Sequence, residues 1–254
     1  MKKNKKNSID DETKFKQRNF HNITQASSDA NLKNFSTSWM LSSVKYEYSY
    51  HFSWLGLPII QYPQDIIAIQ ELIWKIKPDL IIETGIARGG SLIFYTSMMK
   101  LLNNNGTVIG IDIDIREHNK VLIEQHPLYN DNDIIMLEGS STDSSIIKKV
   151  ARVASSKKTI LVILDSNHTH QHVLKELELY SPFVSKNSYL IVLDTIVEQF
   201  PNSLVENRPW SKGNNPHTAV QTFLKNNNNF EIDQTIDAKL LISVAPKGYL
   251  KKVK

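Results

Sequence analysis

Apolar and polar positions follow two alternating patterns over most of the chain. After Pro63, isoleucine and leucine recur near a 3.6-residue period until Lys77-Pro78 interrupts them, which predicts a helix over 63–76. Short, continuous apolar runs alternate with further segments of helical character. The expected strands cover residues 80–82, 107–111, 133–137, 159–164, 188–193, 230–233 and 240–244, and the other expected helices cover 91–102, 144–154, 171–180 and 218–226. Buried strands alternating with helices predict an α/β fold, a doubly wound and mostly parallel seven-stranded sheet with helices on both faces.

The first 45 residues differ in composition from the rest. They are rich in Asn, Lys, Ser and Asp, which predicts a flexible or partly helical tail over 1–45. Aromatic side chains then gather between residues 39 and 54. Such a concentration must cover the core, a partner subunit or a ligand, and core or subunit packing is the expected arrangement. We therefore expect a main domain over 46–254 that includes an N-terminal cap over 46–77, and we expect a homo-oligomer.

Composition narrows the class of protein. The hydrophobic fraction of 41% and the charged fraction of 22% are ordinary for a globular protein of 254 residues. The absence of cysteine excludes disulfides, thiolate-bound zinc, iron–sulfur clusters and a cysteine nucleophile. Apolar runs fall short of the roughly 18 residues that a membrane span needs, and the basic start of the chain lacks the apolar stretch of a secretory signal. A cytoplasmic enzyme or binding protein is the expectation that remains.

The net charge of +4 comes from the two ends of the chain. Four lysines lie in residues 2–6 and three in residues 251–254, and the body between them is near neutral. Basic ends can contact nucleic acid or anionic lipid, but a solubilising role is the simpler interpretation. Because the sequence contains no motif typical of nucleic-acid binding, we expect neither a nucleic-acid partner nor an integral membrane segment.

The expected strand at 80–82 leads into a glycine-rich turn with the sequence Glu83-Thr-Gly-Ile-Ala-Arg-Gly-Gly-Ser91. Its glycines permit a tight turn and a close approach of the backbone to a ligand, immediately before a helix begins. The spacing differs from the G-x-G-x-x-G of dinucleotide-binding proteins, which disfavours an NAD-dependent oxidoreductase. The pattern Glu-x-Gly-x-x-x-Gly resembles the first motif of class I S-adenosylmethionine-dependent methyltransferases.

Acidic residues follow the next two expected strands. Asp112 and Asp114 come after the second strand, where a carboxylate suits the two hydroxyls of a ribose, and either residue can fill this role. Asp143 comes after the third strand, where an acid faces the adenine in the methyltransferase pattern. Each acid alone can be an ordinary polar residue at a strand end. Their succession at the expected strand ends favours a nucleoside-binding site.

The fourth and fifth expected strands also end in carboxylates. Asp165 and Asp194 follow neighbouring strands and can hold a hard divalent ion through oxygen. Such an ion lowers the pKa of a bound hydroxyl, so that attack on an activated methyl group becomes possible near neutral pH. His168 lies three residues after Asp165 and can accept the proton. Alternatively, His168, His170 and His172 are polar residues at a helix start; for the cluster beside Asp165 we favour a functional role.

Several longer blocks resemble the cephalosporin hydroxylase family of methyltransferase-like proteins. They include Trp54-Leu-Gly-Leu-Pro-Ile-Ile-Gln-Tyr-Pro-Gln-Asp65 and Leu164-Asp-Ser-Asn-His-Thr-His170. Further matching blocks lie at residues 77–91, 110–116, 208–210, 213–216 and 245–250, so the likeness extends over residues 46–252. The resemblance implies a class I methyltransferase fold, S-adenosylmethionine as cofactor and a magnesium ion.

The resemblance also carries roles to individual residues. It implies a cofactor-binding set of Glu83, Gly85, Ala87, Gly89, Ser91, Asp112, Asp114 and Asp143, and metal ligands Asp165 and Asp194. Related magnesium-dependent O-methyltransferases carry two adjacent metal-binding side chains after the fifth strand, and here Leu193 stands in the first of these positions. The metal site is therefore weak, completed by His168 or Glu198, or absent.

A long loop after the fifth strand is the expected acceptor site. It contains Arg208-Pro-Trp210 and Gly213-Asn-Asn-Pro216, in the place where methyltransferases often bind their acceptor. Trp210 can stack on a flat or sugar-like face, and Arg208 can hold an anion. Packing of this loop against the aromatic segment 46–54 is an equal alternative. His170 completes the expected acceptor-binding set.

Two functions from different classes fit these residues. The first is a metal-assisted, S-adenosylmethionine-dependent O-methyltransferase that acts on a hydroxyl of a small molecule, or of a sugar or glycan precursor in polysaccharide or lipopolysaccharide biosynthesis. The second is a cofactor-binding partner protein without turnover of its own, accessory to a hydroxylase or methoxylation system, and Leu193 keeps it open. The hydroxylase chemistry in the family name is not expected, because a non-haem iron oxygenase needs two histidines and a carboxylate on one face.

Overall fold

The computed structural model describes residues 2–103 and 106–254, with the backbone alone for residues 2–9. Its main sheet has the strand order β5-β4-β3-β6-β7-β9-β8. The strands are β3 (Leu80–Thr84), β4 (Thr107–Asp112), β5 (Ile134–Glu138), β6 (Ile160–Leu164), β7 (Tyr189–Val192), β8 (Phe230–Ile232) and β9 (Tyr249–Lys252). Strands β5 to β7 along this order are parallel, whereas β9 runs antiparallel to both β7 and β8. The expected mostly parallel, seven-stranded sheet is confirmed.

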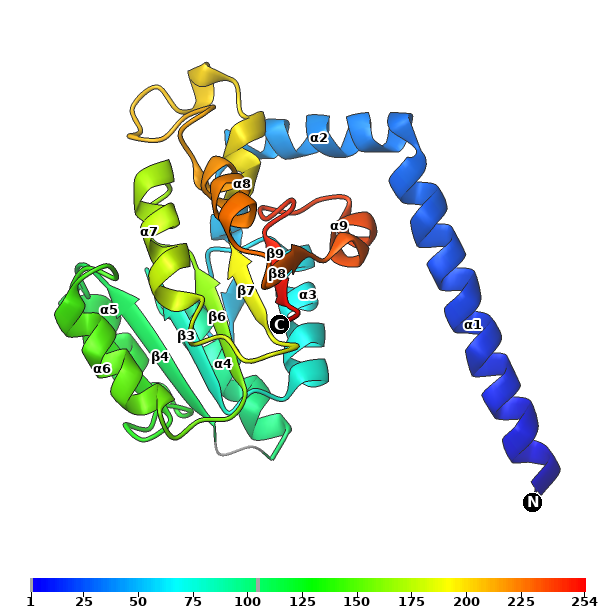
Figure 1. Cartoon of the computed structure of the whole chain (residues 1–254), viewed down its shortest axis with the longest axis horizontal. Helices are drawn as coiled ribbons and strands as arrows, with labels where there is room; N and C mark the ends of the chain where they lie inside the picture. Colours follow the sequence, from blue (N-terminus) through cyan, green and yellow to red (C-terminus); the bar gives the residue numbers. More distant parts are fainter. Residues whose placement is uncertain (1, 104–105) are drawn as a thin grey trace.

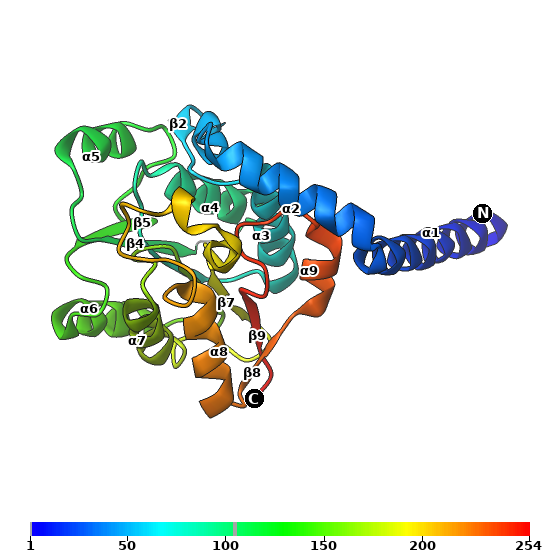
Figure 2. The same ribbon diagram turned by 90° about the horizontal axis from the view of Figure 1, so that it is seen from above.

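Helices cover both faces of the sheet, as Figure 2 shows. The helices on one face are α3 (Pro63–Ile76), α4 (Gly90–Leu101) and α5 (Glu117–Glu124), and those on the other are α6 (Ser144–Ala154), α7 (His170–Tyr180) and α8 (Pro216–Asn226). Side chains of each strand alternate between the two faces. On β3, for example, Ile81 packs toward α3 and α4, while Leu80 and Ile82 pack toward α6 and α7. Both faces are therefore buried, which explains the continuous apolar strands.

The last part of the chain differs from the sequence-based prediction. Residues 240–244 do not form a strand; Leu240 ends α9 (Gln234–Leu240), residues 241–244 follow it as a loop, and the last strand is β9 at 249–252. A buried carboxylate explains the difference. Asp65 of α3 accepts hydrogen bonds from Ser243 Oγ (2.6 Å), the Val244 amide (2.9 Å) and Tyr249 Oη (2.8 Å). Because the Val244 amide donates to Asp65, it is not available for the hydrogen bonds that would join this segment to the sheet as a strand. Helices α5 and α9 were also not expected from the sequence.

The N-terminal region is helical, with α1 (Lys2–Ser28), α2 (Ala30–Val44) and the 3-10 helix η1 (Tyr48–His51). Figure 1 shows α1 extending away from the body of the protein, and Figure 2 shows α2 on the side of the body that carries α3 and α4. Asp29 caps α2 by accepting a hydrogen bond from the Leu32 amide at 3.0 Å. In the described parts of the chain, no helix combines enough length with enough apolar character to cross a bilayer.

The aromatic side chains before α3 pack on the body of the protein. Tyr48 lies within 5.0–5.5 Å, between ring centroids, of Trp39, Phe52 and Tyr62. A short hairpin, β1 (Ser53–Trp54) with β2 (Leu57–Pro58), brings Trp54 to Phe94 of α4 with 4.7 Å between the rings. This packing is the expected covering of the core. The homo-oligomer stays a prediction.

Candidate functional site

The glycine turn between β3 and α4 is held by a carboxylate of the next strand. Gly85 and Gly89 have φ angles of +85° and +80°, a region that glycine adopts without strain. Asp112, at the end of β4, accepts hydrogen bonds through Oδ2 from the amides of Ile86 (3.0 Å) and Ala87 (3.2 Å). The turn and the acid after β4 therefore form one rigid unit.

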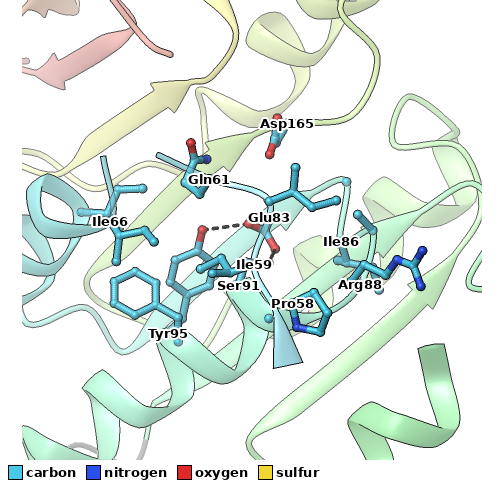
Figure 3. Close-up of a pocket in the computed structure, with 16 residues that line it drawn as sticks. Pro58, Ile59, Gln61, Ile66, Glu83, Ile86, Arg88, Ser91, Tyr95 and Asp165 are labelled. Carbon is cyan, nitrogen blue, oxygen red and sulfur yellow. Dashed lines mark hydrogen bonds between the residues drawn. The ribbon is translucent and has the colours of Figure 1, made fainter. Parts of the chain in front are cut away.

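A small cavity lies under this turn (Figure 3). Glu83 is one of the polar residues that line it; this side chain is buried and accepts hydrogen bonds from Ser91 Oγ (2.5 Å) and Tyr95 Oη (2.8 Å). Burial raises the pKa of the Glu83 carboxyl to about 7, although these two hydrogen bonds act in the opposite direction. Arg88 points away from this carboxyl in the figure, so it does not neutralise the buried acid.

A larger cavity of about 730 Å³ opens across the carboxyl ends of the parallel strands. Parallel α/β sheets bind ligands at this edge. The residues that line it include Gly85, Ala87, Asp112, Gly139, Ser140, Ser141, Asp165, Ser166, His168, His172, Asp194, Arg208 and Trp210. The volume lies within the usual range for sites that bind small molecules. One cavity thus joins the glycine turn to the residues expected to hold a metal and an acceptor.

Three side chains that can hold a metal ion meet in this cavity. One ligand atom from each of Asp165, His168 and Asp194 lies within 4.8 Å of the other two. His168 Nε2 lies 3.2 Å from Asp194 Oδ2. Burial, and next the negative charge of Asp194, raise the pKa of the Asp165 carboxyl well above its ordinary range. Among the described residues, no lysine or arginine forms an ion pair with either carboxylate, and His168 is the basic side chain beside Asp194.

The structure distinguishes the two residues that the sequence offered in place of a second acid. Leu193 is buried, with 1% of its surface exposed, and belongs to the core. Glu198 lies in the 3-10 helix η2 (Thr195–Gln199), and its Oε2 accepts hydrogen bonds from the Gly213 amide (2.9 Å) and Asn215 Nδ2 (2.6 Å). His168, not Glu198, lies beside the two aspartates.

The loop after β7 contributes the wall opposite the glycine turn. Trp210 packs edge-on against His168 with 4.8 Å between ring centroids, and the Arg208 guanidinium lies 5.3 Å from the Trp210 ring centroid. Tyr50, from the aromatic segment, lines the same cavity. The indole of Trp210 is thus next to the cluster of Asp165, His168 and Asp194.

Six residues of the predicted set lie outside the lining of this large cavity. Glu83 and Ser91 line the small cavity under the glycine turn, and Gly89 belongs to the turn itself. The other three are Asp114, Asp143 and His170. Asp114 is exposed and pairs with Arg116 at 3.6 Å, and Asp143 is exposed at the N-cap position of α6. His170 Nδ1 bonds to Thr218 Oγ1 at 2.8 Å, which ties α7 to α8. The local turn and helix geometry sets the direction of these three side chains. Their positions after the strands had suggested that they would face a ligand. Their assigned roles in binding stay predictions.

Sequence reasoning assigned no individual role to several side chains of the cavity, although it favoured a function for the histidine cluster that includes His172. His172 bonds through Nε2 to Ser141 Oγ (3.0 Å) and Ser166 Oγ (3.2 Å), and Glu176 lies one turn further along α7. Gln61, which precedes α3, borders both cavities. The i, i+4 spacing of His172 and Glu176 was the signal available in the sequence.

The strand order and the single reversed strand define a class I methyltransferase fold. Residues 46–253 match the family described as Rhamnosyl O-methyltransferase/CmcI. The chain therefore belongs to the Rhamnosyl O-methyltransferase/CmcI family, which confirms the resemblance to the cephalosporin hydroxylase family.

Similar proteins agree with this membership. A rhamnosyl O-methyltransferase of Mycobacterium leprae is 26% identical over 200 residues, which are 78% of this chain and 82% of the relative. The Mycobacterium tuberculosis protein of the same name is 26% identical and is covered over 77% of its length. A solved structure of CmcI with Mg and SAM has a TM-score of 0.57 and 19% identity, over 81% of this chain and 78% of that chain. This structural likeness supports the fold.

Proposed function

We propose that this protein transfers the methyl group of S-adenosylmethionine to a hydroxyl group of a 6-deoxysugar such as rhamnose, with help from a divalent metal ion. The observation that carries the proposal is the meeting of Asp165, Asp194 and His168 in the same cavity as the glycine turn. The rhamnosyl O-methyltransferase name of the relatives supports the reaction and the class of acceptor.

The cofactor fits the part of the cavity formed by β3, β4 and β5. The turn at Gly85 and Gly89 lets the backbone approach a ligand closely, and Glu83 offers a buried carboxylate beside it. Asp112 lines the large cavity and is fixed by the turn, so one carboxylate can hold the loop and face the ribose hydroxyls. S-adenosylmethionine supplies an electrophilic methyl group when it is bound.

The metal would be held by Asp165 and Asp194. The donor set fits a hard divalent ion, because both ligands are carboxylates and no lysine or arginine in the described part of the chain pairs with them. Magnesium commonly uses one or two carboxylates and keeps water in its remaining positions, so the leucine at 193 does not prevent binding. When bound, the ion lowers the pKa of an acceptor hydroxyl.

His168 is the proposed general base. In the transfer, a bond forms between the acceptor oxygen and the methyl carbon, the bond from carbon to sulfur breaks, and its electron pair stays on sulfur. The hydroxyl proton moves to the imidazole of His168. Asp194, 3.2 Å from Nε2, orients the ring and stabilises its protonated form.

The acceptor fits the part of the cavity near β7. Trp210 offers an aromatic face, and Val197, Phe200, Leu204 and Val205 give that wall an apolar character. A 6-deoxysugar presents a methyl group where other hexoses carry a hydroxymethyl group, so an apolar wall favours it. Sugar recognition is thus supported by the lining as well as by the relatives.

The test is a methyl-transfer assay with S-adenosylmethionine, Mg²⁺ and a rhamnose-terminated glycoside, followed by mass spectrometry of the product. We expect a gain of one methyl group that depends on Asp165 and on metal. Cofactor binding without transfer to any hydroxylated acceptor would contradict the enzyme and would favour the partner-protein alternative. Absence of cofactor binding would contradict the whole proposal.

A further inference from the structure

The cavity wall beside Ser141 contains a histidine that the proposed reaction does not use. His172 lies in the first turn of α7, and 23% of its side chain is exposed. Its Nε2 atom contacts Ser141 Oγ at 3.0 Å and Ser166 Oγ at 3.2 Å. Glu176 is completely buried, and its Oε1 lies 3.5 Å from the same nitrogen. The histidine is therefore fixed on one side and borders the cavity.

The hydrogen bonds of Ser166 determine which ring nitrogen carries the proton. Ser166 Oγ donates its single hydrogen to Glu176 Oε1 at 2.7 Å. Toward His172 this oxygen is an acceptor, so Nε2 must be the donor. An N–H group at Nε2, which lies 3.5 Å from Glu176 Oε1, also lowers the cost of burying this carboxyl group, whose second oxygen has no hydrogen-bond partner among the described residues. In the neutral ring, Nδ1 is then a hydrogen-bond acceptor.

Nδ1 of His172 has no hydrogen-bond partner in the described part of the chain. The strand order places the His172 ring at the end of the cavity where we expect the adenine base of the cofactor to bind. From β6, the sheet continues through β3 and β4 to β5 at its edge. Asp112, the proposed ribose partner, follows β4, and Ser141 follows β5, one strand farther from Asp194. A ring bonded to Ser141 borders the space beyond the ribose.

We propose that His172 recognises the adenine base of the cofactor, with Nδ1 accepting a hydrogen bond from the exocyclic amino group. Glu176 and Ser166 are positioning residues that keep the ring in the required tautomer. A 6-oxo purine such as hypoxanthine carries a carbonyl oxygen at the same place, which sets two acceptors against each other. His172 thus selects a 6-amino over a 6-oxo purine. This inference rests on the proposed function, because it needs the cofactor in the cavity.

The test compares S-adenosylhomocysteine with S-inosylhomocysteine, which differ at this position of the base, by calorimetric titration in mildly alkaline buffer. We expect the wild type to bind S-adenosylhomocysteine at least about 10-fold more tightly than S-inosylhomocysteine. The first compound gains a hydrogen bond to Nδ1, whereas the second places an acceptor oxygen against the same atom. His172→Ala should bring the ratio of the two dissociation constants close to one. His172→Gln, which restores an acceptor oxygen, should recover part of the ratio.

The matched control is Gln171→Ala, one residue away on α7 and exposed. It should keep the wild-type ratio, and circular dichroism should show that all variants are folded. Equal binding of the two compounds by the wild type, or an unchanged ratio in His172→Ala, would overturn the role of His172 while leaving the proposed function intact. Binding of neither compound by the wild type would overturn the proposed function and this inference with it.

Discussion

Gly85 lies directly against the backbone of Asp165, so the glycine turn and the end of β6 that we propose to bind the metal are in contact. A Cβ atom at Gly85 would lie 2.1 Å from the Asp165 carbonyl oxygen and 2.9 Å from Cα of Ser166. The Gly85 amide also donates to the Ile111 carbonyl at 2.7 Å. Three strand ends therefore converge at one residue, and the two halves of the proposed site cannot shift independently.

Gly85→Ala should abolish measurable binding of S-adenosylhomocysteine and destabilise the fold by at least about 3 kcal/mol. The alanine has two costs. A positive φ costs a residue with a Cβ atom about 1–2 kcal/mol, and the added Cβ atom also overlaps backbone atoms of Asp165 and Ser166. Gly56→Ala is the control, because Gly56 has a φ of +97° but a Cβ atom added there would meet nothing within 4 Å. It should cost only the conformational term. Equal effects of the two variants in urea unfolding would contradict the packing argument.

Asp194→Asn should weaken metal binding by roughly 10-fold or more. The substitution removes one of the two carboxylates that we propose as metal ligands. Electron paramagnetic resonance of Mn²⁺ added to the apoprotein measures this without an activity assay. Glu198→Gln is the control, because the Glu198 carboxylate bonds to Gly213 and Asn215. The metal affinity of this variant should equal that of the wild type. Loss of affinity in the control alone would place the metal elsewhere.

His168→Ala should lower kcat by about 10²–10⁴-fold, the usual contribution of a general base. If the imidazole accepts the proton and does not bind the ion, Mn²⁺ affinity should stay at the wild-type value. His118→Ala, an exposed histidine on α5, serves as the control and should keep full activity. A parallel fall of kcat and metal affinity in His168→Ala would make this residue a metal ligand instead.

Glu83 should make the protein less stable as the pH rises. Its carboxyl has a pKa of about 7 in the folded protein, above its ordinary value of 4.5, because burial disfavours the charged form. The neutral acid therefore stabilises the fold fully below pH 4.5, and this contribution disappears as the pH rises to about 7. The free energy of unfolding, compared with Glu83→Gln, should fall by about 3 kcal/mol across this window.

Tyr95→Phe gives an independent check on Glu83. The tyrosine donates to Oε1 at 2.8 Å and so favours the ionised carboxylate. Its removal should raise the pKa of Glu83 further and shift the loss of stability to higher pH. Urea unfolding at a series of pH values would show the shift, and a shift to lower pH would contradict the assignment.

Trp210→Ala should raise the KM for a rhamnose-terminated acceptor about 10-fold, the effect of one lost aromatic contact. The dissociation constant of S-adenosylhomocysteine should not change, because the indole contacts His168 on the β7 side of the cavity. Trp74→Ala removes an exposed tryptophan from α3 and should leave both constants unchanged. A rise in the cofactor constant alone would move Trp210 to the other half of the site.

Hydrophobic patterning was sufficient to predict the parallel strands and most of the helices. Strand β6, for instance, is almost wholly apolar because both faces of the sheet are covered. The last strand was misplaced because residues 240–244 are as apolar as a strand, yet Asp65 binds the backbone at Val244. That contact joins residues 179 positions apart. The residues around 240–244 therefore could not indicate that Asp65 binds this segment.

The same division applies to the site. The sequence by itself determined which residues follow each strand, so the placement of Asp112, Asp165 and Asp194 at one edge of the sheet could be predicted. Only the tertiary structure decided the direction of each side chain. His168 and His172 line the cavity, whereas His170, between them, bonds to α8. The reason is physical: strand order depends on apolar periodicity along the chain, but side-chain direction in a turn depends on backbone angles and partners contributed by distant segments.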